Sequence, residues 1–536
     1  MHFDMEPARD REIREHAVPS RAGMSRLRSI AACAIMSTLI FLSSCGGGVS
    51  PAAIPVVTPN TADNVLTQAD VDSIVKAAAS SVNVPLVIAI SDRRGQILAV
   101  YQKANAPATA TANFDTAQPA DEVAAALART AAYFSNDQAP IGSRTVRYLS
   151  GIHFPPGVAN SESAPLYGIE NTNRGCGFNT AYLPGQSLPV PQLLHSAAPG
   201  LGIQTGKADV FDSNPNAVDP GGVPIFKNGR LAGGIGVAAA PTLANSGAVT
   251  EYAAVAGTLD NGFAPVVPYP GVVVVGGVAL PFVNQTTLPP GVSAGAADGG
   301  YSFGPTAGSG PAPEGDLIAE HAGQPGGLTL AQVRQIVQNT VATGNLTRAA
   351  IRLPVGVRAR FVIAVADLDG SLLALYRMPD ATVFSVDVAV AKSRNVVYFS
   401  GNPGNDLPGV PAGTAVTNRT VGFGAQPLYP EGINGTQPGP FFPLFLNDLA
   451  NPCTQGSQPV SANQNGVVFF PGSLPLYLNG KLVGGLGVSG DGVDQDDYAA
   501  AGGAVGFYAP LAIRADQIFI RNVRLPYQKF PRNPTD

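Results

Sequence analysis

The chain has few of the residues on which catalysis, metal binding and nucleic-acid recognition most often depend. Its 536 residues include no Trp, five His and four Cys, and only 13% are Asp, Glu, Lys or Arg. The formal net charge is −5 and no basic run is present, so binding to nucleic acid has no electrostatic basis. Neither a P-loop nor a His-Glu-x-x-His motif occurs. The composition therefore gives no direct sign of an enzyme or a nucleic-acid-binding protein.

Glycine and proline are abundant instead, with 62 and 48 residues, which indicates many turns and loops. Against this background one segment of eighteen residues occurs twice. It reads PGGVPIFKNGRLAGGIGV at 220–237 and PGSLPLYLNGKLVGGLGV at 471–488, with ten identical positions. The chain is therefore expected to be a doubled domain. The copies are predicted at 66–290 and 328–534, joined by a Gly/Ala/Pro/Ser-rich linker at 291–327.

Residues 24–45 are expected to form a lipoprotein signal peptide. A short basic start precedes an apolar run at 29–41, which is shorter than the ~20 residues of a membrane-spanning helix. The run ends in Leu-Ser-Ser before Cys45, which resembles a bacterial lipoprotein cleavage site. Cys45 would then carry lipid, residues 46–65 would form a tether, and the protein would lie on the periplasmic or outer face of the bacterial cell envelope. An ordinary secretory signal or membrane anchor is the alternative, and residues 1–23 are expected to precede the true start.

Cysteine usage agrees with export. Once the signal is removed and Cys45 is lipidated, only Cys176 and Cys453 remain. Each follows an Arg-Thr-Val triplet, 32 residues after Arg144 and 34 residues after Arg419, so the two occupy nearly the same place in the two copies. In an oxidising compartment they are candidates for a disulfide between the copies, with two unpaired thiols as the alternative. No second Cys or His lies at ligand spacing, so neither a zinc site nor a thiol-redox site is expected.

Both copies are predicted to follow one order of elements: a capped helix, an Asp-x-x-Gly hairpin, a second helix, a long insert, an Asn-Gly hairpin, a third helix and a last strand. The first hairpin is placed at 86–101 and 361–376, the second helix at 124–134 and 389–399, the start of the third helix near Tyr252 and Tyr498, and the last strand at 278–282 and 523–527. Asp92 and Asp367 are interpreted as turn formers rather than catalytic acids. The Gly-Gly-x-Gly runs of the second hairpin lack the strand–turn–helix context of a dinucleotide loop and are interpreted as close backbone packing.

This order of elements, together with the Asn-Gly hairpin that ends in GGxGV, resembles the GlcG/HbpS-type haem-binding family. The nearest motif is in the second copy, at 479–492 and then 494–496, where the family shows Gly-Val-Ser-Gly-Gly and Glu-Gln-Asp. The first copy departs from it, with Ala-Ala-Ala-Pro at 238–241 and only Glu251 near the helix start. The resemblance implies an α/β (α+β) fold of two tandem profilin-like domains, each an antiparallel sheet flanked by helices, with long Gly/Pro-rich inserts. Such proteins are often oligomeric, and the family name implies haem as cofactor.

A haem site would need an axial His, Met, Tyr or Cys and cations for the propionates. His153, on the insert of the first copy, is the leading axial candidate, and Met378, Tyr429 and Tyr167 are weaker ones. The candidates for the propionates are Arg144, Arg419, Lys392 and Arg394. Each of these residues also has a structural interpretation, as packing or as part of a salt bridge.

The leading hypothesis is an envelope-anchored lipoprotein that binds haem or another small ligand, has no catalytic activity and has the lipid bilayer as a partner. A structural or scaffolding lipoprotein is the first alternative. A hydrolase or isomerase is the second, and it would use His153 and the acidic cluster Asp491, Asp494, Asp496 and Asp497. These aspartates are interpreted more simply as negative charge that stabilises a helix N-terminus. No resident metal ion is expected.

Overall fold

The computed structural model describes residues 64–177, 188–212, 219–266, 272–401 and 403–535. The predicted extension, the signal peptide with Cys45 and nearly all of the tether lie outside these residues. No helix within them is long and apolar enough to cross a membrane.

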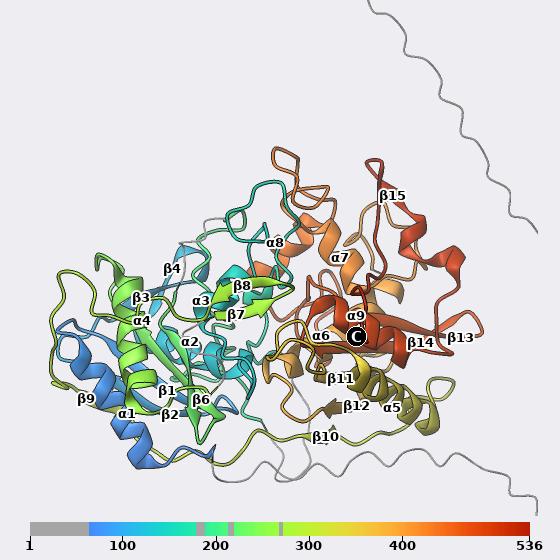
Figure 1. Cartoon of the computed structure of the whole chain (residues 1–536). Helices are drawn as coiled ribbons and strands as arrows, with labels where there is room; N and C mark the ends of the chain where they lie inside the picture. Colours follow the sequence, from blue (N-terminus) through green and yellow to red (C-terminus); the bar gives the residue numbers. More distant parts are fainter. Residues whose placement is uncertain (1–63, 178–187, 213–218, 267–271, 402, 536) are drawn as a thin grey trace, which may run out of the picture. The chain divides into compact units, whose positions relative to one another are not determined.

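The first repeat is built on a five-stranded antiparallel sheet of order β5-β6-β1-β2-β9 (Figure 1). Its strands are β1 Val87–Asp92, β2 Ile97–Gln102, β5 Gly222–Lys227, β6 Arg230–Ala238 and β9 Gly300–Phe303. Helices α1 Gln68–Ser81 and α4 Ser246–Gly257 pack together on one face, and α2 Ala120–Phe134 packs on the other. A small hairpin, β3 Thr109–Ala112 and β4 Thr116–Pro119, precedes α2.

The second repeat has a sheet of the corresponding order, β13-β14-β11-β12-β10. Its strands are β10 Gly315–Ile318, β11 Phe361–Ala366, β12 Leu372–Arg377, β13 Ser473–Leu478 and β14 Lys481–Gly490. Helices α5 Leu330–Leu346 and α9 Val493–Gly503 lie side by side, and α6 Phe384–Gly401 packs along β14 and β11 (Figure 1). The predicted fold class is confirmed: two copies of an antiparallel sheet flanked by helices.

The central strands β1 and β11 are buried at every position because both faces of each sheet are covered. In β1, Ile88 and Ile90 belong to the core beneath α1 and α4, whereas Val87 and Ala89 belong to the core beneath α2. Successive side chains of a strand point to opposite faces, so a strand between two helical layers loses the usual alternation of apolar and polar residues.

The glycine runs of β6 and β14 allow the long helices α2 and α6 to lie close to their sheets. A Cβ atom at Gly234 would overlap the main-chain oxygen of Ala128 in α2. A Cβ atom at Gly485 would likewise overlap the main-chain oxygen of Ser393 in α6. The interpretation of these runs as close backbone packing is confirmed, and a larger side chain at either position would push the helix away from the sheet.

The predicted turns and caps are confirmed. Asn228 and Asn479 each start a two-residue hairpin turn with positive φ, 52° and 50°, and a glycine follows each of them. Thr67 and Thr329 both cap their helices in full capping boxes. Asp92 accepts hydrogen bonds on Oδ1 from the main-chain N–H groups two and four residues later, both at 2.9 Å, as a turn former does.

Three predicted elements differ in the structure. The stretch 291–327 is not a loose linker, because it contributes β9 to the first sheet and β10 to the second. Edge strands of this kind pair through main-chain groups and need little hydrophobic side-chain area, so composition did not indicate them.

The last strands are not part of the main sheets. They form separate hairpins, β7 Val272–Val275 with β8 Val278–Pro281, and β15 Phe519–Ile520 with β16 Val523–Arg524. The third helices, α4 and α9, begin five or six residues before Tyr252 and Tyr498.

One large apolar cluster contains residues of both repeats, and a disulfide joins their inserts. Phe134 at the end of α2 stacks on Phe384 at the start of α6, with ring centroids 4.0 Å apart. Cys176 and Cys453 form a disulfide bond with a Cα–Cα distance of 5.1 Å. The inserts themselves carry the short helices α3 Ser143–Tyr148, α7 Asn418–Gly424 and α8 Phe442–Ala450.

Candidate functional site

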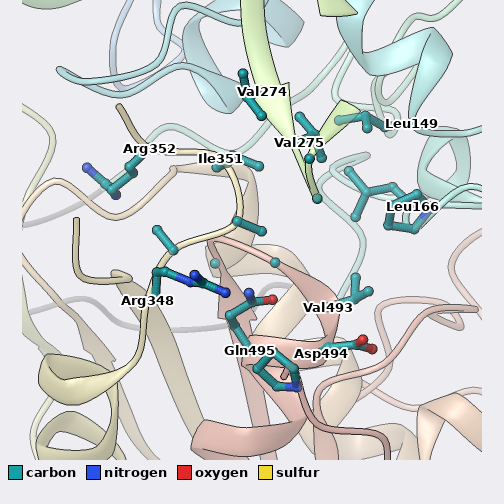
Figure 2. A pocket seen from close by; sticks show the side chains of 18 of the residues that line it. Leu149, Leu166, Val274, Val275, Arg348, Ile351, Arg352, Val493, Asp494 and Gln495 are labelled. Atoms are coloured by element: carbon teal, nitrogen blue, oxygen red, sulfur yellow. The ribbon is translucent and has the colours of Figure 1, made fainter. Parts of the chain in front are cut away.

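A cavity of about 530 Å³ lies where the two repeats meet (Figure 2). The first repeat contributes one wall through its insert and through the tip of the β7–β8 hairpin, including Leu149, Leu166 and Val275. The second repeat contributes the loop around Ile351 and the start of α9. This volume falls within the range of ~300–1,000 Å³ that is usual for small-molecule sites.

The walls of this inter-repeat cavity are mainly apolar. The stacked rings of Phe134 and Phe384 both border it, and Figure 2 shows Leu166 and Val275 along one side. The loop after β14, with Gly490 and Gly492, lies at the edge of the cavity. A ligand bound here would bury apolar surface against the repeats.

Three arginines border the cavity, and their charges are not equivalent. Arg352 is neutralised: its Nη1 lies 2.7 Å from Oδ2 of Asp380, and its Nε forms an ion pair with Asp491. The guanidinium of Arg348 donates to the main-chain oxygen of Arg532, at 3.4 Å. Within the described parts of the chain, neither Arg348 nor Arg532 forms an ion pair with a carboxylate. Figure 2 shows Arg348 directed into the cavity and Arg352 directed away from its centre.

The predicted propionate partners are used in internal ion pairs and lie elsewhere. Arg144 forms a two-pronged pair with Glu251, at 2.7 Å for both contacts, and its twin Arg419 contacts Asp497 at 2.6 Å. Lys392 is fully buried and contacts Asp496 at 3.0 Å. None of these cations borders the inter-repeat cavity.

Arg394 and the predicted axial residues also lie outside the cavity wall. Arg394 donates to the main-chain oxygen of Gly370 at 2.9 Å. Nδ1 of His153 lies 3.0 Å from the main-chain oxygen of Ser161, and the hydroxyl of Tyr429 donates to a main-chain oxygen at 3.2 Å. Met378 and Tyr167 are buried away from the cavity. Over the described ranges, the structure does not bring the predicted candidates together in one site.

The acidic cluster is a set of ion pairs rather than free charge at a helix end, so the simpler interpretation was incomplete. Asp491 pairs with Arg352, Asp496 with Lys392, and both Asp494 and Asp497 with Arg419. Burial raises the pKa of Asp496 to about 7, although Lys392 opposes this shift. Among the residues that the structure describes, no group of His, Cys, Asp and Glu could hold a metal ion.

A second hollow, of about 560 Å³, lies on the second repeat and is lined by aromatic residues such as Tyr508 and Phe530. Its cation is already paired within the chain, although the hydroxyl of Tyr527 has no hydrogen-bond partner among the described residues. Arg514 pairs with Asp516 at 2.5 Å and lies over the ring of Tyr527, and the hydroxyl of Tyr508 donates to a main-chain oxygen. The inter-repeat cavity is therefore the stronger candidate.

The second repeat matches a known protein family. Residues 328–504 match the family described as "Haem degrading protein HbpS-like". Over these residues the second repeat resembles an HbpS-like domain. The matched residues supply Arg348–Arg352, Val355, Phe384, the end of β14 with the loop after it, and the start of α9 to the inter-repeat cavity, while the first repeat and residues 531–532 supply the remainder. The site is therefore not contained in the HbpS-like domain alone.

Several proteins share sequence similarity with part of the chain. The corrinoid adenosyltransferase PduO of Citrobacter freundii is 30% identical over 151 residues, which are 28% of this chain and 33% of that protein. The Salmonella typhimurium enzyme of the same name is 28% identical over 151 residues, with the same coverage. An uncharacterised 15.0 kDa protein of C. freundii is 29% identical over 173 residues, 32% of this chain and 87% of that protein. The chain thus spans about a third of the adenosyltransferases that it matches.

Two solved structures are also similar to part of the chain. A PduOC–haem complex shows 21% identity and a TM-score of 0.23, covering 34% of this chain and 95% of that one. Protein ORFY of Klebsiella pneumoniae shows 20% identity and a TM-score of 0.22, covering 33% and 89%.

Sequence reasoning missed the arginines that do border the cavity. Arg348 and Arg532 lie in irregular segments that are 184 residues apart, and no local pattern marks them. One signal was present: Asp491 stands where the family shows a second glycine, and this aspartate pairs with Arg352 at the cavity wall. A carboxylate at a position where the family has a glycine indicates that an oppositely charged side chain lies nearby.

Proposed function

We propose that the protein binds haem, or another apolar small molecule that carries carboxylates, in the inter-repeat cavity and catalyses no reaction on it. The observation that carries this proposal is an apolar cavity bordered by Arg348 and Arg532, whose charges are not used in ion pairs of the described chain. The description of the family that the second repeat matches supports haem as the ligand class. Arginine is well suited to hold the carboxylates of such a ligand.

The residues present fit the organic part of haem better than its iron. The apolar wall around Phe134 and Phe384 suits a flat macrocycle, and Arg348 and Arg532 suit its propionates. Haem iron takes His, Met, Cys or Tyr as protein ligands. None of these residue types is among the described residues that border the cavity.

Titration of the lipid-free mature chain with hemin tests the proposal. We expect a Soret shift that saturates at one hemin per chain, because two repeats build one cavity. Ile351→Trp should abolish the saturable shift by filling the cavity, and Leu346→Trp, at an exposed position outside it, should not. A linear, non-saturating response, or equal binding by both variants, would show that the cavity is not the site.

We further propose that Cys45 is lipidated and anchors the chain to the bacterial cell envelope. The sequence before Cys45 supports this, since small residues directly precede the cysteine at the end of a short apolar run. The Cys45→Ser variant should move from the membrane fraction to the soluble fraction and should lose incorporation of labelled palmitate. Retention of the variant in the membrane fraction would instead favour an uncleaved membrane anchor.

A further inference from the structure

Arg348 and Arg532, which form no ion pair within the described residues, lie at one rim of the inter-repeat cavity, where main-chain contacts join their segments. The N–H of Arg348 donates to the main-chain oxygen of Pro534 at 2.6 Å, and its guanidinium donates to that of Arg532 at 3.4 Å. Arg358 donates to the main-chain oxygen of Thr535 at 2.9 Å. These contacts fasten the segment 531–535 to the loop that follows α5. The main chain at Arg348 and at Arg532 is thereby kept beside the same opening.

Other charges near this rim are already balanced. Arg352 is held by Asp380 and Asp491, both of which accept from it. Asp494, the acidic residue of the cavity wall, contacts Arg419 at 2.6 Å. Among the described residues, the charge that remains for a ligand is therefore positive, and guanidinium groups bind carboxylates through paired N–H···O contacts.

The same wall provides no group for iron among the described residues. His153 is adjacent in sequence to Phe154, which borders the cavity, but His153 itself does not. The side chain of His153 is buried within the insert, where its Nδ1 contacts the main-chain oxygen of Ser161, rather than at the cavity wall. Phe134 and Phe384, whose rings stack on each other with an interplanar angle of 8°, form part of the apolar wall. A flat aromatic ligand can pack on such a surface whether or not it contains a metal.

We propose that the cavity recognises a planar macrocycle through its carboxylate arms and its apolar ring and not through its iron, so that metal-free porphyrin dicarboxylates bind as well as haem. This inference rests on the proposed function and specifies the ligand class of the same site. It also assigns Arg348 and Arg532 as the residues that select for carboxylates.

The test is a titration of the lipid-free mature chain with three probes: hemin, metal-free protoporphyrin and the dimethyl ester of that porphyrin. Hemin and the free diacid should bind with Kd values within about threefold, and the ester should bind at least about tenfold more weakly. The double variant Arg348→Gln/Arg532→Gln should weaken both diacids by about tenfold or more and leave the ester unchanged. Arg334→Gln, an exposed position on α5, and His153→Ala should leave all three unchanged.

The outcomes separate this inference from the proposed function. If hemin binds but the free porphyrin does not, or if His153→Ala removes hemin binding, recognition depends on iron and the inference fails, while haem binding stands. If no probe binds saturably, the proposed function fails as well. If Arg334→Gln weakens binding as much as the double variant does, the effect is one of net charge and the inference fails. Arg532→Gln alone, on an exposed residue of the terminal segment, repeats the test should the double variant unfold.

Discussion

Asp92 illustrates how a residue that shapes a turn can also make stability depend on pH. The carboxyl group is 2% exposed, and its Oδ1 accepts main-chain hydrogen bonds from Arg94 and Gln96. Burial nevertheless outweighs these hydrogen bonds and raises its pKa to about 6. The folded chain therefore holds a proton on Asp92 at pH values where the unfolded chain has lost it.

Replacement of Asp92 by Asn should reduce the loss of stability with rising pH. Because its folded pKa lies above the unfolded value, the contribution of Asp92 is greatest below pH 4 and is lost as the pH rises through 6. Between pH 4.5 and 7.5 the variant should lose less stability than the native chain, by about 2 kcal/mol, because the unfolded chain has already lost most of this proton at pH 4.5. Melting curves at both pH values measure this. Asp260→Asn, at an exposed position, is the control, and an equal change in both variants would contradict the prediction.

At the scale of elements, the repeated Arg-Thr-Val triplet fastens each insert to the rest of its domain. Thr145 donates to the main-chain oxygen of Pro281 at 3.1 Å, and Thr420 donates to that of Pro526 at 2.7 Å. The arginine of each triplet pairs with the acidic residue of the third helix, as described above. The triplet therefore makes the same kinds of contact in both copies, which explains why it recurs.

Loss of either arginine should leave a buried carboxylate without its partner. In the first repeat, Arg144→Met tests this directly, because it removes the arginine that pairs with the fully buried side chain of Glu251. We expect a loss of about 3–5 kcal/mol in the free energy of unfolding. The double variant Arg144→Met/Glu251→Gln should recover most of it, since no buried charge remains. Chemical unfolding of the native chain and both variants gives the comparison, and a double variant no more stable than the single one would contradict this explanation.

Elements with a local signal could be predicted from the sequence, and those formed by distant contacts could not. The caps at Thr67 and Thr329 and the Asn-Gly turns depend on residues within four positions of one another, so they are visible in the chain. Strands β9 and β10 gain their partners only from the folded sheets. The inter-repeat cavity is likewise formed by segments hundreds of residues apart, so its arginines could not be predicted from the sequence. The fold and the family resemblance could be predicted.

At the scale of the whole molecule, a charge network beneath the cavity joins the repeats. Asp380 of the second repeat contacts Arg93 of the first at 2.5 Å and Arg352 at 2.7 Å. Burial opposes ionisation of Asp380, but the two arginines prevail and lower its pKa to about 2. Because the folded pKa lies below the unfolded one, this stabilisation is complete above pH 4 and is lost only as the pH falls toward 2. The disulfide between Cys176 and Cys453 joins the repeats at a second place.

Asp380→Asn should therefore weaken the junction between the repeats at neutral pH. Arg93 and Arg352 are almost fully buried, and without the carboxylate their positive charges face each other with less compensation. We expect a loss of about 3–5 kcal/mol in stability. Release of Arg352 from Asp380 should also disturb the cavity wall, so hemin affinity should fall together with the melting temperature. Asp260→Asn should change neither. If Asp380→Asn melts at the native temperature, the network does not hold the repeats together, and the shared apolar core and the disulfide carry the junction instead.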